Sequence, residues 1–149
     1  SYKYIFGVNS LNRARNLQSQ VSQIDLDISL KQLSHQSSFN ETNDTASLYY
    51  MQRVKDNLIL ERDALISTAI VAASEILMDE IEHKVAGYLS LGRIMIDSIL
   101  SFMSIYNIKV RISVLARTQL IQLSLKLLLP DMPYMDLPAK IERLDKLLY

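Results

Sequence analysis

The chain of 149 residues contains no cysteine and no tryptophan, and it has only three glycines and three prolines. The missing cysteine excludes a disulfide framework and any thiolate metal site. Glycine and proline are also missing from the whole stretch between residues 8 and 86. Because these two residues make turns and end helices, such a stretch predicts long helices.

A net charge is also missing, since sixteen Lys and Arg residues balance sixteen Asp and Glu residues. A balanced chain offers no net positive field to a phosphate backbone, so nucleic acid is not expected as a partner. The uncharged stretch from Ser98 to Ile108 is far shorter than the roughly 20 residues of a membrane-spanning helix. Residues 1–8 lack the basic and apolar regions of a signal peptide. We therefore interpret the chain as soluble and without a transmembrane segment.

Residues 1–34 are predicted to form an arm followed by a first helix. One apolar set recurs every three or four residues and consists of Leu17, Val21, Ile24 and Ile28. A second set, Leu26, Leu30 and Leu33, widens the apolar face, so this helix is expected to contact more than one neighbour. The aromatic and β-branched residues 2–8 are compatible with a helical or an extended arm, and they are too apolar to leave in water.

A polar interval at residues 35–45 is expected to be a loop, with Asp44 or Thr45 capping the helix that follows. The second helix is predicted over residues 46–86. Gly87 and Gly92 bracket the clearest break in the chain, because glycine readily takes the left-handed conformation that ends a helix.

Residues 93–129 again lack glycine and proline and are predicted to be an apolar central helix. Within them, Ile108, Val110 and Ile112 alternate with polar residues, so residues 106–114 are open to an extended conformation as well. Three prolines then mark a connector, at Pro130, Pro133 and Pro138. A short amphipathic helix is predicted over residues 137–149.

These elements together predict an all-α fold over a single domain, residues 1–149. It would hold three or four helices, two or three of them long, packed like an elongated bundle or coiled coil.

One pair of residues has the spacing of a metal site. Glu80 and His83 stand three residues apart, as in the Glu-x-x-His motifs of di-iron bundles. A working site needs a second such pair, and the other histidine, His35, has Gln32 at the corresponding position. No metal, no cofactor and no catalytic residues are therefore predicted, and an enzyme is the least favoured class.

The predicted function is instead the packing of long amphipathic helices against copies of the chain or against a helical partner protein. The residues expected at that interface are Leu17, Val21, Ile24, Ile28, Leu33, Leu48, Met51, Leu58, Leu120 and Leu123. The alternative is a helical adaptor, scaffold or chaperone subunit of a larger intracellular complex.

The first third of the chain also resembles the N-terminal segment of bacterial flagellins. Asn9-Ser10-Leu11 lies at the family's usual distance from the start of the chain, and Leu33-Ser34 follows at a matching interval. Leu33-Ser34, Asn40, Asp44 and Ala46 have the spacing of the family pattern LSSG-x-x-IN-x-x-x-DDAA. Further on, Gln52-Arg53-Val54-Lys55 is similar to the family's QRVRE, and residues 117–122 are similar to its RAQILQ. Gln36 stands where the family has glycine, and Thr45 replaces the second aspartate.

This resemblance implies a filament subunit whose terminal helices pair in an inner tube. It further implies export through the flagellar apparatus to an extracellular filament, whereas the adaptor alternative implies a cytoplasmic protein.

Overall fold

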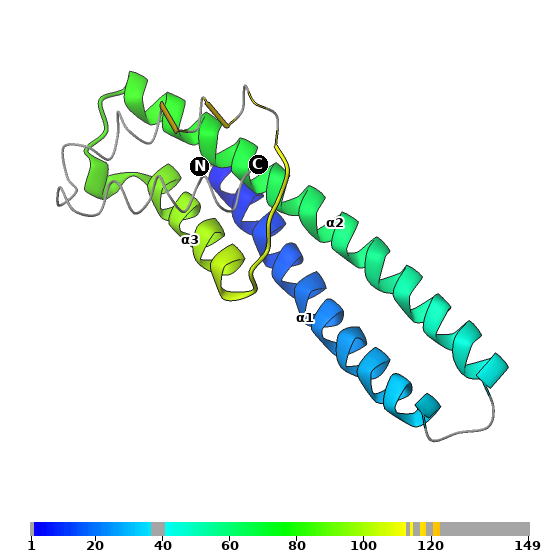
Figure 1. Cartoon of the computed structure of the whole chain (residues 1–149). Helices are drawn as coiled ribbons and strands as arrows, with labels where there is room; N and C mark the ends of the chain where they lie inside the picture. Colours follow the sequence, from blue (N-terminus) through cyan, green and yellow to red (C-terminus); the bar gives the residue numbers. More distant parts are fainter. Residues whose placement is uncertain (1, 37–40, 113, 115–116, 119–120, 123–149) are drawn as a thin grey trace. The chain divides into compact units, whose positions relative to one another are not determined.

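A computed structural model describes residues 2–36, 41–112, 114, 117–118 and 121–122 of the chain. Over these ranges the elements are α1 (Tyr2–Gln36), α2 (Glu41–Glu82), the 3-10 turn η1 (Gly87–Leu89) and α3 (Leu91–Ile105) (Figure 1). The fold is all-α, as predicted. None of the helices in the described part of the chain is long and apolar enough to cross a membrane.

The first two helices begin earlier than predicted, and α2 also ends earlier, at Glu82 instead of at residue 86. The expected arm is helical, because α1 begins at Tyr2, and Gly7 lies inside this helix rather than ending it. The loop predicted over residues 35–45 overlaps both helices, since α1 ends at Gln36 and α2 begins at Glu41 instead of near Ala46. Asp44 and Thr45 therefore lie within α2 and do not cap its start. The predicted C-terminal helix, residues 137–149, lies outside the described residues.

The chain divides into two compact units, to each of which α1 and α2 contribute a part. Unit 2 comprises residues 12–64 and is a hairpin of two helices. The antiparallel pairing follows from two contacts, Gln18 with Arg62 and Asp25 with Lys55. Its buried apolar residues come from α1 and are Ala14, Leu17, Val21 and Ile28.

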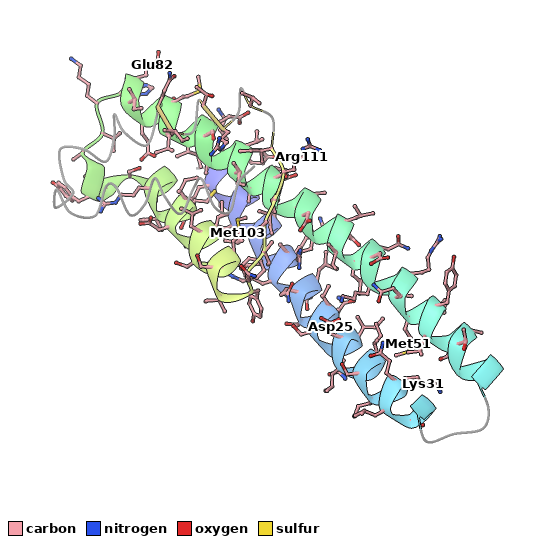
Figure 2. All side chains as sticks on the ribbon, viewed as in Figure 1. Asp25, Lys31, Met51, Glu82, Met103 and Arg111 are labelled. Atoms are coloured by element: carbon pink, nitrogen blue, oxygen red, sulfur yellow. The ribbon has the colours of Figure 1, made fainter. Side chains whose placement is uncertain are left out.

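Unit 1 comprises residues 1–11 and 65–149, and in it α3 packs with the first turns of α1 and the second half of α2. Its largest fully buried apolar side chains are Ile66, Leu77, Met95, Ile99 and Met103 (Figure 2 labels Met103). Two glycines allow the helices to approach closely. A Cβ added at Gly7 would lie 3.2 Å from the Cβ of Ala72, and one added at Gly92 would lie 2.7 Å from Cγ of Leu77.

The ends of α2 and α3 show which residues stop these helices. Lys84 and Asn107 have positive φ angles of 55° and 51°. At each end the next residue closes the helix, since Val85 N–H donates to the Glu80 carbonyl at 3.0 Å and Ile108 N–H donates to the Met103 carbonyl at 2.8 Å. This is the Schellman arrangement. The expectation that Gly87 and Gly92 supply the left-handed residue is therefore wrong, since no glycine has a positive φ in the described residues.

The predicted central helix, residues 93–129, is interrupted after residue 105, whereas the described residues 114, 117–118 and 121–122 are helical. The helix α3 ends at Ile105, and residues 106–112 are not helical. Ile108 and Val110 are buried, whereas Lys109 between them is exposed. This alternation is that of extended chain packed on one side, the alternative to helix that the sequence allows for residues 106–114.

Candidate interaction surface

The helix α1 has two apolar faces within unit 2. Leu17, Val21 and Ile28 are only 9%, 4% and 9% exposed, whereas Leu26, Leu30 and Leu33 are 53%, 56% and 64% exposed. We call the second group the leucine stripe. At about 100° of rotation per residue, Leu26 and Leu30 each lie about 160° around the helix from Ile28. The stripe therefore points away from the face of α1 that is buried in the hairpin.

The buried face of α1 is held in register by polar contacts with α2. Arg62 is buried, and its Nη1 donates to Oε1 of Gln18 at 2.6 Å, while its Nη2 donates to the Asp63 carboxylate at 2.8 Å. Nearer the loop, Lys55 forms an ion pair with Asp25 (Asp25 is labelled in Figure 2). A buried guanidinium requires such partners, so these contacts occupy the face of α1 that carries the first apolar set.

The structure divides the predicted interface residues into three groups. Leu17, Val21 and Ile28 are buried within the hairpin, and Leu33 is exposed on the leucine stripe. Partly buried in unit 2 are Ile24, Leu48, Met51 and Leu58. Leu120 and Leu123 lie outside the described residues. Most of the described interface residues thus pack within the chain itself. The exposed residues are instead those of the second apolar set, Leu26, Leu30 and Leu33, which was expected to contact a further neighbour.

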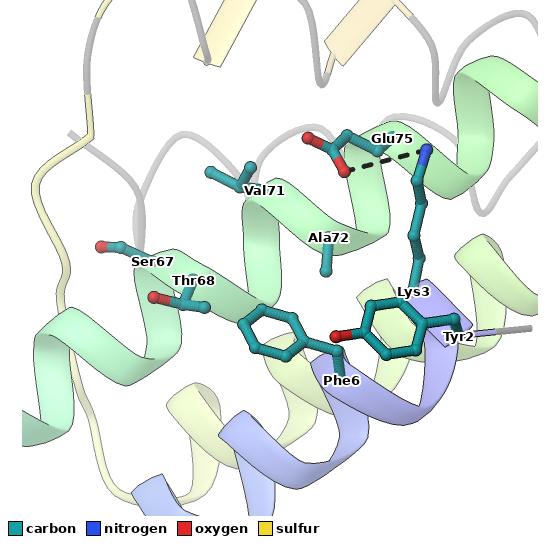
Figure 3. Close-up of a pocket in the computed structure, with 8 residues that line it drawn as sticks. All are labelled: Tyr2, Lys3, Phe6, Ser67, Thr68, Val71, Ala72 and Glu75. Atoms are coloured by element: carbon teal, nitrogen blue, oxygen red, sulfur yellow. Dashed lines mark ion pairs between the residues drawn. The ribbon is translucent and has the colours of Figure 1, made fainter.

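A groove in unit 1 was not found from the sequence. Its volume is about 530 Å³, and its lining comprises Tyr2, Lys3, Phe6, Ser67, Thr68, Val71, Ala72 and Glu75 (Figure 3). Small side chains of α2 leave room beneath the aromatic rings of α1, and the ammonium of Lys3 lies 4.0 Å from the Glu75 carboxylate. Tyr2 is 85% exposed, which contradicts the expectation that the aromatic residues of the arm are kept out of water.

Glu80 has a structural task at the start of α3. Its carboxylate is buried and accepts hydrogen bonds from the Ser90 hydroxyl and from the N–H groups of Leu91 and Gly92, each at 2.9 Å. Ser90 caps α3 by accepting from Arg93 N–H at 3.0 Å. An anion is favoured at this end of a helix, where N–H groups have no partner within the helix. Both carboxylate oxygens of Glu80 thus bind the start of α3 and do not form a shared site with His83.

The acidic end of α2 brings Asp79, Glu82 and His83 together. Their potential ligand atoms lie within 4.8 Å of one another, and all three side chains are exposed (Glu82 is labelled in Figure 2). Asp79 raises the pKa of His83 above 6.5 in two ways. The larger effect is the hydrogen bond between Nδ1 of His83 and the Asp79 carbonyl, at 2.8 Å, and the smaller effect is the negative charge of the Asp79 carboxylate. An exposed cluster of this kind is common on helices and does not by itself form a metal site.

We predict that the imidazole of His83 titrates above pH 6.5 and that Asp79→Asn lowers its midpoint. The raised pKa means that protonation favours the folded state, so this contribution is present below pH 6.5 and disappears as the pH rises through the folded-state pKa. Proton NMR of the imidazole of His83 measures its midpoint in the natural chain and in the Asp79→Asn variant. If Asp79→Asn leaves the midpoint of His83 unchanged, the carboxylate contributes nothing to it.

Comparison of this chain with protein-family models, curated protein sequences and solved structures finds no match.

Proposed function

We propose that this protein is a non-enzymatic assembly protein in which α1 packs against copies of the chain through the leucine stripe. The observation that supports this function is the pair of apolar faces on α1. One face is buried against the chain itself, and the other is exposed at Leu26, Leu30 and Leu33. A helix with apolar residues on two opposite faces needs two neighbours, and unit 2 supplies one of them.

The spacing of the exposed leucines supports a helix as the second neighbour. Single exposed apolar residues are ordinary on protein surfaces, but these three follow one another at intervals of four and three residues. That interval is the repeat by which one helix packs lengthwise on another. Exposure of the three leucines to water is unfavourable, and packing a second helix on the stripe would bury them.

The resemblance to flagellins favours an open-ended form of this assembly. Part of the resemblance, from Asn9 to Ser34, falls on α1 itself, and it implies a filament built from pairing helices. The alternative function is a helical adaptor, in which the stripe binds a helix of a different protein. Electron microscopy of the concentrated protein separates the two, since filaments support the first form and discrete particles the second.

We predict that the purified protein self-associates as its concentration rises and that Leu30→Asp keeps it monomeric. A carboxylate in the middle of an apolar helix contact loses its hydration without gaining a partner, which costs several kcal/mol. Gln32→Asp is the matched control, because Gln32 is exposed on the same turn but off the stripe. Sedimentation velocity over a concentration series measures all three proteins.

The control should self-associate like the natural chain. Equal self-association of Leu30→Asp would show that the stripe is not the contact, and a natural chain that stays monomeric at about 1 mM would contradict self-assembly altogether.

A further inference from the structure

The leucine stripe has the geometry of a coiled-coil seam on the outer side of unit 2. Leu26 and Leu33 take the d positions of a heptad, and Leu30 takes the a position between them. The contacts of Gln18 and Asp25 with α2 lie on the buried face of α1, away from the stripe, so α2 does not obstruct a helix that approaches the stripe. The side chains that flank the seam decide which helix fits.

An antiparallel second copy fits this seam poorly. In antiparallel coiled coils an a residue packs opposite a d residue of the partner. If Leu30 lies opposite Leu26, the flanking Asp27 of one copy comes beside Asp27 of the other, and like charges in direct contact repel. If Leu30 lies opposite Leu33 instead, Leu26 has no leucine opposite it. Each antiparallel alignment therefore has either a repulsive contact or a lost layer.

A parallel second copy avoids both defects. Each leucine then packs on the same leucine of the partner, because parallel helices align a with a and d with d. The flanking contacts become Asp27 with Ser22 and Ser34 with Ser29, which bring no like charges together. We propose that the second neighbour of α1 is the α1 of another copy, aligned in parallel and in register along the leucine stripe. This inference rests on the proposed function, since it names the partner and the orientation of that assembly.

Gln23 extends the seam by one layer and supports the parallel register. It occupies the a position before Leu26, is exposed, and donates to the Asp27 carboxylate at 3.1 Å. In a parallel pair the two Gln23 side chains face each other and can exchange hydrogen bonds. A polar a residue paired with itself is a known means of fixing register and orientation in coiled coils.

Disulfide trapping tests the orientation, because the chain has no cysteine of its own. In Gln23→Cys, parallel pairing places the two new thiols in one layer, within the roughly 4.4–6.8 Å Cα separation that a disulfide needs. Either antiparallel alignment separates them by ten or more residues, about 15 Å along the helix. Gln32→Cys is the control, since position 32 is exposed but away from the seam.

The expected result is a disulfide-linked dimer of Gln23→Cys that forms about tenfold faster than that of Gln32→Cys, because pairing raises the local thiol concentration. Adding Leu30→Asp should remove the difference. If the chain self-associates through the stripe but the disulfide of Gln23→Cys forms no faster than that of the control, the parallel copy is wrong and the proposed function stands. If the chain does not self-associate, both are wrong.

Discussion

Glu80→Ala is expected to lower the free energy of unfolding by about 3 kcal/mol. The carboxylate of Glu80 accepts three hydrogen bonds at the start of α3, from the Ser90 hydroxyl and from two backbone N–H groups. Ser90 is fully buried, so water does not readily replace the lost acceptor. Each buried donor left without an acceptor costs about 1–3 kcal/mol, and the attraction between the carboxylate and the positive end of the helix is lost as well.

Urea denaturation followed by circular dichroism measures this effect. Glu82→Ala is the matched control, because Glu82 lies two residues away on the same helix and is exposed, and its loss should change the stability by less than about 0.5 kcal/mol. Glu80→Gln should fall between the two, since the amide keeps one acceptor but brings a donor against the N–H groups. Equal stabilities of the Glu80→Ala and Glu82→Ala proteins would show that the α3 contact contributes nothing.

The helical class of this protein could be predicted because the evidence for it is local. A stretch from residue 8 to residue 86 without glycine or proline lacks the turns that would connect successive short strands, so it favours long helices. The repeat of Leu17, Val21 and Ile28 likewise identified a buried face, and these residues are buried in unit 2. Periodicity does not say which helix covers a face, so residues that pack within the hairpin were predicted to lie at an interface.

The helix ends were predicted less well, because residues other than glycine supply the left-handed position. Asn107 ends α3 with a φ of 51°, and asparagine is the usual alternative to glycine there. Lys84 ends α2 with a φ of 55°, and nothing in a lysine side chain signals this. The burial of Ile108 and Val110 on one side of the chain compensates for ending α3 in the middle of an apolar stretch.

The role of Glu80 could not be predicted from spacing alone. Its position three residues before His83 suggested a shared face, but the contact that orients the carboxylate is with the N–H groups of residues 91 and 92. That contact depends on how the chain folds back after α2. Ser90 was the signal available in the sequence, since a serine just before an apolar stretch commonly caps a helix. It marks the start of α3, where the free N–H groups that bind the Glu80 carboxylate lie.

The two glycines inside helices give the second large prediction, in which Gly92→Ala lowers the stability by about 2 kcal/mol. The new Cβ would lie 2.7 Å from Cγ of Leu77 and 2.9 Å from Oε1 of Glu80. Leu77 is fully buried, and its Cγ is a branch point that cannot move without displacing the whole side chain. Gly92 is the second residue of α3, so alanine gains there at most the roughly 1 kcal/mol that it gains in a helix interior, and this gain offsets only part of the overpacking.

Gly7→Ala is the matched comparison, because its closest contacts are of a different kind. The new Cβ would meet Sδ and Cε of Met95 at 2.5 and 2.6 Å, which are the far end of an unbranched side chain that can change rotamer. The helix gain should then nearly cancel the strain, and the stability should change by less than about 1 kcal/mol. Thermal and urea unfolding of both variants measure the difference. If Gly7→Ala is as destabilising as Gly92→Ala, Met95 cannot adjust within the core of unit 1, and if both are neutral, α2 and α3 are not packed as closely as the 2.7 Å approach requires.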